Sequence, residues 1–438
     1  MTYAEAVARL LALRGGEHAG MRPGLERIEG LLGALGRPEE RYTLVQVGGT
    51  NGKGSVAAML ATILKYAGRR VGLYTSPHLV SFRERIRVDG DAIPEDAVVD
   101  GVDALGTLVA RFDATMFEAA TALALDHFAR ESVEVAVLEV GLGGRLDATT
   151  VGMPAVTVLA SIAMDHEAWL GSTLGAIAEE KAAIIRSGVA LSAAQEPEVA
   201  AVVERHAARA RVPLLVAGRD LHVRVRERTL DAQRIDCAGP AWAVDDLALA
   251  MLGTYQPGNA LLAVAAAQAL GASVTAIREG LARTVWPGRF QVVRRDPWLV
   301  LDGAHNPAGA AALARSLAET FGDAPVTLVV ATAADKDARG ILAALVPRAR
   351  RVVLTRSSSA RSADPAALAA AMPATGPRAE IAPDVATALA LAASDGGAPV
   401  TCVAGSLFLL GDVLRALRSG DDTPCSIEKA ADSMGRLS

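Results

Sequence analysis

A glycine-rich segment that follows an apolar run constrains the fold of this chain most strongly. The sequence VQVGGTNGKGSVAAML at 45–60 joins a strand-like run to a helix-like run through four glycines. Backbone N–H groups of such a turn converge on phosphate oxygens, and the helix N-terminus adds the positive end of its dipole. The strict phosphate-loop pattern GxxxxGK[ST] is not met, because Gly54 separates Lys53 from Ser55. The segment therefore predicts a variant phosphate-binding loop.

We expect this loop to hold the phosphates of ATP. Lys53 supplies positive charge, and Ser55, at the start of the helix, can bind Mg²⁺. The residues expected to bind the nucleotide are Gly49, Thr50, Asn51, Gly52, Lys53, Gly54 and Ser55. The alternative is an ordinary glycine-rich turn between a strand and a helix.

Composition indicates a globular α/β protein. The 438 residues exceed one ordinary core, and the aromatic share of 4% means that the core is built from Ala, Leu and Val. The net charge of −5 provides no basic surface, so nucleic acid is not an expected partner. The cysteines at 237, 402 and 425 form no CxxC pair, which excludes a zinc site or disulfide framework and favours the cytoplasm. No apolar run reaches the roughly 18 residues of a membrane span, so no membrane association is expected.

Strand-like runs alternate with helical patterns, which is typical of βαβ units. We expect strands at 43–47, 70–74, 133–140 and 155–163, helices at 55–67, 94–108, 115–130 and 257–271, and further strands at 298–303, 326–331, 351–355 and 400–405. Short alternating segments at 213–250 predict a small antiparallel insertion, and Pro with Gly at 284–290 indicates a linker.

The predicted fold class is α/β with two domains. A phosphate-loop domain with a mostly parallel sheet and the small antiparallel insertion is expected over 1–285. A smaller, Rossmann-like α/β domain is expected over 286–418, and an irregular tail over 419–438.

Polar residues follow the predicted strands of the first domain. Glu139 ends an apolar strand, where ligands bind in open α/β sheets and where a carboxylate is a natural Mg²⁺ ligand. Ser76 and the pair Asp165 and His166 follow two other strands. Each of these positions has a plain alternative: a solvated strand end, a turn residue before proline, or a surface histidine.

The second domain has one comparable turn, in LVLDGAHNPAG at 299–309. Asp302 is suited to bond a ribose hydroxyl. Asn306 precedes Pro307, and this pair also predicts a helix N-cap.

Eight strings taken together carry a family resemblance. They are GTNGKGS, TSPHL, LEVGLGGRLDAT, DHEAWLG, EEKAAIIRSG, PGRFQ, DGAHNP and AGSLF. In order and spacing, the chain resembles the folylpolyglutamate synthase and dihydrofolate synthase family, relatives of the Mur ligases, from about residue 20 to residue 418. The resemblance implies an ATP-dependent amide ligase that phosphorylates the carboxylate of a folate or a pteroate. The amine of L-glutamate then attacks the acyl phosphate.

The resemblance also implies roles for individual residues. Ser76, Glu139 and His166, with Ser55, resemble ligands for two Mg²⁺ ions, and Asn259, Arg289 and Asp302 resemble nucleotide contacts. The expected catalytic residues are Lys53, Lys181, His166 and His305. Lys181 matches a lysine that is carbamylated in this family, and His305 is expected near the incoming glutamate.

Two segments match the side of the family's site that binds the pteridine. They comprise Thr115, Met116, Phe117 and Glu118, and Leu146, Asp147 and Ala148. Phe117 is expected to stack on the flat ring, and its alternative is a helix core position. Arg22 stands where members that make dihydrofolate often have Asp. We therefore expect folate extension more firmly than use of dihydropteroate, and we allow both.

The two alternative functions are a cell-wall Mur ligase and a nucleotide-binding module. A cell-wall Mur ligase would usually carry a further N-terminal domain, whereas only about 40 residues precede the loop here. A nucleotide-binding module that forms no amide bond would need the standard GK[ST] ending. We expect a monomer, because no exposed apolar stripe stands out.

Overall fold

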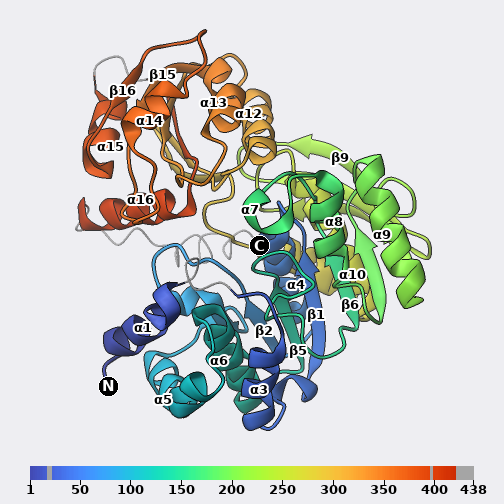
Figure 1. Ribbon diagram of the computed structural model, residues 1–438. Helices are drawn as coiled ribbons and strands as arrows, with labels where there is room; N and C mark the ends of the chain where they lie inside the picture. Colours follow the sequence, from blue (N-terminus) through green and yellow to red (C-terminus); the bar gives the residue numbers. More distant parts are fainter. Residues whose placement is uncertain (17–21, 395–397, 421–438) are drawn as a thin grey trace. The chain divides into compact units, whose positions relative to one another are not determined.

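The computed structural model describes residues 1–16, 22–394 and 398–420 (Figure 1). Two compact units are present. The first comprises Met1–Arg228, Gln233–Leu249 and Gln256–Thr284, and the second comprises Thr229–Ala232, Ala250–Tyr255 and the chain from Val285. The assignment of functions to domains 1–285 and 286–418 stays a prediction.

The first unit is built on an eight-stranded sheet with the order β4-β3-β2-β5-β1-β6-β7-β8. Its strands are β1 (Thr43–Gly48), β2 (Val71–Tyr74), β3 (Ile86–Val88), β4 (Asp91–Ala92), β5 (Val135–Glu139), β6 (Val156–Leu159), β7 (Val189–Ser192) and β8 (Leu214–Val216). In this order, all neighbouring strands from β2 across to β8 pair in parallel. Strands β3 and β4 add an antiparallel edge beside β2. The central strands are apolar and buried along almost their whole length, as expected for parallel strands covered on both faces.

Helices cover this sheet (Figure 1). They are α1 (Tyr3–Leu11), α3 (Glu26–Ala34), α4 (Lys53–Tyr66), α5 (Glu95–Arg111), α6 (Met116–Arg130), α7 (Glu167–Leu170), α8 (Leu174–Ala182), α9 (Pro197–Ala210), α10 (Gln256–Ala269) and α11 (Val274–Arg283), with 3₁₀ turns at Leu13–Gly15, Pro38–Glu40 and Phe82–Arg85. Helix α4 is buried on most sides because it packs against both the sheet and the pair α10 and α11. The phosphate loop therefore leads into a helix that is buried in the core of the unit.

The predicted antiparallel insertion is shorter than expected. It is a separate three-stranded sheet of β9 (His222–Arg228), β10 (Gln233–Gly239) and β11 (Trp242–Leu249). The segment from 213 was wrongly included, because β8 pairs in parallel with β7 and extends the main sheet. Strand 155–163 was also predicted too long. It ends at Leu159, and the next residues bond to the phosphate loop instead.

The second unit has a six-stranded sheet with the order β12-β13-β17-β14-β15-β16. Its strands are β12 (Gln291–Arg295), β13 (Trp298–Leu301), β14 (Val326–Val330), β15 (Ala349–Leu354), β16 (Ala379–Ile381) and β17 (Val400–Ala404), and its helices are α12 (Pro307–Phe321), α13 (Ala338–Leu345), α14 (Pro365–Ala370), α15 (Val385–Ala393) and α16 (Leu407–Gly420), with a 3₁₀ turn at Val346–Arg348. Only β12 runs antiparallel to its neighbour among these strands.

The predicted fold class is confirmed: both units are α/β, with a mostly parallel sheet in each. Helix α16 continues to Gly420, into the predicted tail, and residues 421–438 of that tail lie outside the described residues. Over the described ranges, every helix is too short or too polar to cross a membrane.

Candidate functional site

Four neighbouring strands of the first unit bring the predicted residues to one edge of the sheet. Strands β2, β5, β1 and β6 are adjacent and parallel, so their carboxyl ends point the same way. The segments that leave these ends carry Ser76, Glu139, the phosphate loop and His166. Ligands of open parallel sheets bind at this edge. The topology thus gathers residues that are far apart in the sequence, such as Thr50 and His166.

The tip of the phosphate loop is bonded to the segment that follows β6. The backbone N–H groups of Thr50 and Asn51 both donate to the carbonyl oxygen of Ser161, at 2.7 and 3.1 Å. The Thr50 hydroxyl donates to the carbonyl oxygen of Ala163 and accepts from its N–H, both at 3.1 Å. These bonds fix the shape of the loop, and they place the side chain of Thr50 in a supporting role.

Two glycines of the loop cannot be replaced without strain. Gly49 has φ 129°, and a Cβ there would lie 2.9 Å from the carbonyl oxygen of Ala160. Gly52 has φ 97°, and its Cβ would lie 2.5 Å from Oδ1 of Asn259. Both positions combine a left-handed backbone with a close neighbour, so they require glycine. The predicted nucleotide residue Asn259 therefore lies directly against the loop.

Two lysines also bond to the loop. Lys53 Nζ donates to the carbonyl oxygen of Thr50 at 3.2 Å, and Lys181 Nζ donates to that of Gly49 at 3.1 Å. Lys181 lies on α8 and is only 4% exposed. Two ammonium groups beside the N-terminus of α4 provide the positive field that a polyphosphate needs.

A buried glutamine at the loop was missed by the sequence analysis. Gln256 Nε2 donates to Ser55 Oγ at 3.3 Å, and Gln256 Oε1 accepts from Asn259 Nδ2 at 3.0 Å. Gln256 is fully buried. Its spacing of three residues from Asn259 on α10 was the available signal, since such residues share a helix face.

The predicted metal ligands lie at the same sheet edge. Glu139 ends β5, and its Oε2 accepts the N–H of Ser76 at 3.2 Å. His166 begins α7 with φ 55°, and Asp165 Oδ1 accepts its N–H at 2.8 Å. In the described part of the chain, no group of three or more His, Cys, Asp or Glu could hold a metal ion. Carboxylate and hydroxyl oxygens do suit Mg²⁺, which binds few protein groups and keeps waters, so the site stays a prediction.

The first predicted pteridine segment opens α6. Thr115 is the N-cap, and Glu118 Oε2 accepts both its N–H and its hydroxyl at 2.8 Å. Met116 is fully buried in the core. Phe117 is half-buried, with its ring centroid 6.0 Å from that of Tyr74. Of this segment, the ring of Phe117 is the group that remains available for stacking.

The second predicted segment is a turn organised by Asp147. Its Oδ2 accepts the N–H of Leu142 at 2.8 Å, and its Oδ1 accepts the N–H and hydroxyl of Thr149 at 2.9 and 2.5 Å. Burial raises the pKa of the Asp147 carboxyl. Ala148 is also buried, and Leu146 is partly exposed.

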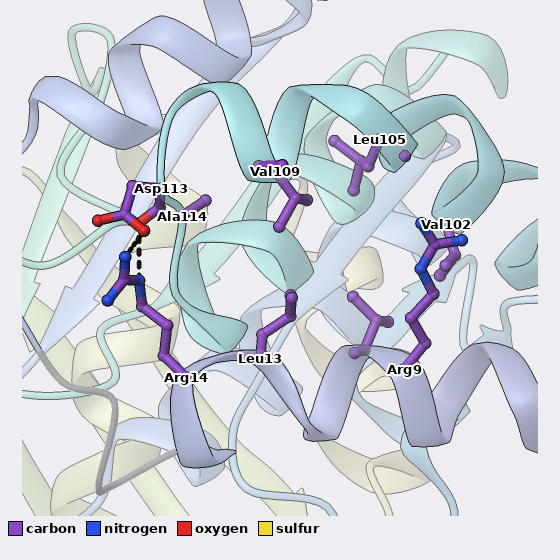
Figure 2. Close-up of a pocket in the computed structure, with 11 residues that line it drawn as sticks. Arg9, Leu13, Arg14, Val102, Leu105, Val109, Asp113 and Ala114 are labelled. Atoms are coloured by element: carbon purple, nitrogen blue, oxygen red, sulfur yellow. Dashed lines mark hydrogen bonds and ion pairs between the residues drawn. The ribbon is translucent and has the colours of Figure 1, made fainter.

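A cavity of about 260 Å³ lies between α1 and α5, close to the first of these segments (Figure 2). Its walls are mostly apolar, and its charged lining residues are Arg9, Arg14 and Asp113. Asp113 forms ion pairs with Arg14 and with Arg22. Arg22 could be identified from the sequence, but its partner Asp113 could not.

In the second unit, Asp302 follows β13 and organises a turn. Its Oδ2 accepts the Tyr255 hydroxyl at 2.5 Å and the N–H of Phe290 at 2.8 Å, and its Oδ1 accepts the N–H of Ala304 at 2.8 Å. Burial raises the pKa of this carboxyl. The bond from Phe290 fixes the turn that carries the predicted nucleotide residue Arg289, whose Nη1 donates to the carbonyl oxygen of Gly288 at 3.1 Å.

The turn that Asp302 organises also carries His305 and Asn306. His305 Nδ1 lies 2.8 Å from the carbonyl oxygen of Gly303. Because a carbonyl oxygen only accepts hydrogen bonds, this contact requires the tautomer with its hydrogen on Nδ1. Asn306 Oδ1 accepts the N–H of Gly309, so the predicted N-cap of α12 is confirmed.

Comparison with known proteins agrees with this architecture. Residues 47–267 match the Mur ligase middle domain, and residues 288–407 match the glutamate ligase domain of Mur ligases. The dihydrofolate synthase/folylpolyglutamate synthase of Mycobacterium tuberculosis is 38% identical over 376 residues, which cover 80% of this chain and 77% of that protein. A solved folylpolyglutamate synthase from M. tuberculosis, complexed with ADP and AMPPCP, superposes with a TM-score of 0.88 at 35% identity, covering 96% of this chain and 100% of that one.

A relative from Haloferax volcanii is named probable bifunctional folylpolyglutamate synthase/dihydropteroate synthase. It is 38% identical over 430 residues, which cover 94% of this chain and 50% of that protein. The chain thus spans about half the length of this relative and of a like-named one from Halobacterium salinarum. With both Mur ligase domains matched and close identity over most of its length, the chain belongs to the folylpolyglutamate synthase and dihydrofolate synthase family.

Proposed function

We propose that this protein is an ATP-dependent ligase that adds L-glutamate to folates and also accepts dihydropteroate. The observation that carries the proposal is the phosphate loop with Lys53 and Lys181 bonded to its carbonyls. The relatives named for this activity, and the solved relative bound to ADP and AMPPCP, support it.

The proposed reaction has two steps. The substrate carboxylate attacks the terminal phosphorus of ATP, which gives an acyl phosphate and ADP. The amine of glutamate then attacks the acyl carbon and releases phosphate as the amide forms. Both steps depend on positioning and on neutralising charge more than on a protein nucleophile.

The loop residues supply those two effects. The N-terminal N–H groups of α4 and the ammonium group of Lys53 bind the phosphates and orient the terminal one. Asn259 lies against Gly52 and so is placed to contact the nucleotide. In the second unit, Asp302 and His305 share the turn after β13, and the bond from the Phe290 N–H to Asp302 links this turn to the one that carries Arg289. We assign these two turns to the nucleotide and the incoming glutamate.

Mg²⁺ fits the oxygen donors at the sheet edge. Ser55, Ser76, Glu139 and His166 would hold it, and when bound it would neutralise charge on the phosphate oxygens. We further propose that Lys181 is carbamylated in the working protein, which would exchange its cation for a carboxylate. Mass spectrometry of native protein in saturating bicarbonate tests this, and an unmodified Lys181 would count against it.

The flat ring of the substrate is assigned to the ring of Phe117, and Leu146 and Arg22 are assigned to the same proposed site. We propose that the protein works as a cytoplasmic monomer. Light scattering of the purified chain, with and without substrates, tests the monomer, and a stable dimer would contradict it.

Phosphate release with L-glutamate tests the proposed function directly. Tetrahydrofolate and dihydropteroate are compared as acceptors, with ATP present and glutamate omitted as the blank. Release with both acceptors is expected. Release with tetrahydrofolate alone would contradict the proposed use of dihydropteroate. Release with neither acceptor would contradict the assignment of a folate substrate. Turnover that does not depend on glutamate would instead indicate a module that forms no amide bond.

A further inference from the structure

A buried ion pair joins the start of α3, which follows Arg22, to the segment that carries Phe117. Arg27, on α3, and Glu118, on α6, are 91 positions apart, and their side chains are 8% and 5% exposed. Arg27 Nε donates to Glu118 Oε1 at 2.9 Å and to Oε2 at 3.1 Å. The pair thus links the start of α3 to the start of α6.

Each member of the pair also holds backbone on its own side. Arg27 Nη2 donates to the carbonyl oxygen of Arg22 at 2.5 Å and to that of Gly24 at 3.4 Å. Glu118 Oε2 accepts the N–H and the hydroxyl of Thr115, both at 2.8 Å. One continuous set of bonds therefore runs from residues 22–25, here called the Arg22 loop, to the turn before Phe117.

The partners leave Glu118 with little capacity for a ligand. Its two oxygens accept two bonds from Arg27 and two from Thr115, and its side chain is almost completely buried. Arg27 is similarly occupied, because its third nitrogen, Nη1, donates to Glu26 at 2.6 Å. The role of Glu118 is therefore better explained by its bonds to Arg27 and Thr115 than by direct contact with the substrate.

Stability alone does not explain such a pair. Removing two charges from water is costly, and well-packed apolar residues often serve a core as well or better. A buried pair with several hydrogen bonds provides a fixed geometry, because the planar guanidinium group of arginine can bond a carboxylate in only a few arrangements. Here the fixed quantity is the position of the Arg22 loop relative to the ring of Phe117.

We propose that Arg27 and Glu118 are positioning residues for the folate side of the site. They set the distance between the Arg22 loop and Phe117 and thereby determine the KM for the folate substrate without touching it. This inference rests on the proposed function.

The test compares Arg27→Lys and Glu118→Gln with the wild-type protein. Lysine keeps the charge but has one nitrogen, so it cannot bond Glu118, Arg22 and Gly24 together. Both variants should raise the KM for tetrahydrofolate by about tenfold to a hundredfold, which corresponds to about 1.4 to 2.8 kcal/mol of lost binding free energy. The KM for ATP and the kcat at saturating folate should stay within about twofold.

Arg351→Lys is the matched control. Arg351 forms a two-bond pair with Glu380 at 2.5 and 2.8 Å, on strands β15 and β16 of the second unit. The same substitution there should leave the folate KM unchanged. Circular dichroism and the Tm of each variant show whether it is folded, and Glu118→Gln keeps the side-chain shape if Arg27→Lys fails to fold.

The outcomes separate the two claims. Wild-type protein that turns over no folate overturns the proposed function and this inference with it. Wild-type turnover combined with variants of lower Tm but unchanged folate KM overturns only the positioning role. Equal rises in the KM for folate and ATP would also overturn it, because they would indicate a general loss of structure.

Discussion

The ammonium group of Lys181 lies 3.1 Å from the carbonyl oxygen of Gly49, to which it donates a hydrogen bond. These residues are 132 positions apart, on α8 and on the loop after β1. We propose that this lysine serves the phosphates directly as a cation when it is unmodified, or the metal site when it is carbamylated. In both cases its nitrogen must lie at the loop.

Lys181→Met should therefore reduce kcat by about 10²- to 10³-fold, as removal of a buried charge-stabilising donor does. Methionine keeps an unbranched apolar stem and lacks only the terminal ammonium group, so the Tm should change little. Lys65→Met is the matched control, because Lys65 is exposed and its Nζ donates to the carbonyl oxygen of Asp89. Activity near the wild-type level in Lys181→Met would refute the assignment.

Gly52→Ala should abolish nucleotide binding. The substitution adds a Cβ at 2.5 Å from Asn259 Oδ1 and strains a backbone with φ 97°, which costs about 1–3 kcal/mol. Gly68 has φ 78° and open space around it, so Gly68→Ala introduces backbone strain without the contact. Calorimetry with ADP should show loss of binding in the first variant and retention in the second. Equal binding by both would mean that the contact with Asn259 is irrelevant.

Arg22→Asp should raise kcat/KM for dihydropteroate relative to tetrahydrofolate, because the Arg22 cation favours the glutamate carboxylates of tetrahydrofolate, whereas Asp accepts hydrogen bonds from the pterin edge. The side chains of Arg22 and Asp113 are about half exposed, so losing their ion pair should cost less than about 1 kcal/mol of stability. Arg22→Ala separates loss of the cation from gain of the carboxylate. An unchanged substrate ratio in Arg22→Asp would remove Arg22 from the specificity argument.

Cys237 and Cys402 should resist thiol reagents in the folded protein. Burial raises the pKa of Cys237 to about 12 and also raises that of Cys402, so neither thiol forms the reactive thiolate at pH 8. Titration of a Cys425→Ser variant with a disulfide reagent should find no fast-reacting thiol until denaturant is added. Two thiols should then react. Rapid reaction of the native variant would contradict the burial of these strands.

Much of the fold was predictable because the information is local. The turn after β1 needs glycine, and the T-x-x-E spacing of Thr115 and Glu118 predicts a capping box. The short edge strands β12 and β16 were missed, because brief half-exposed segments carry little periodicity.

Side-chain pairing was largely beyond the sequence. Nothing near Glu118 indicates Arg27, and nothing near Arg22 indicates Asp113, since each pair is separated by 91 residues. Gln256 was missed for a related reason. Its contact with Ser55 spans 201 residues and becomes evident only when α10 packs beside α4.

The bonds from Thr50 and Asn51 to Ser161 have a consequence for how a nucleotide binds. They join the loop to the same segment that leads to His166, so both elements take their positions as the sheet forms. A nucleotide then meets a preorganised receptor and loses little affinity to the entropy of ordering a loop. The rigidity of this corner is acquired during folding, before any ligand arrives.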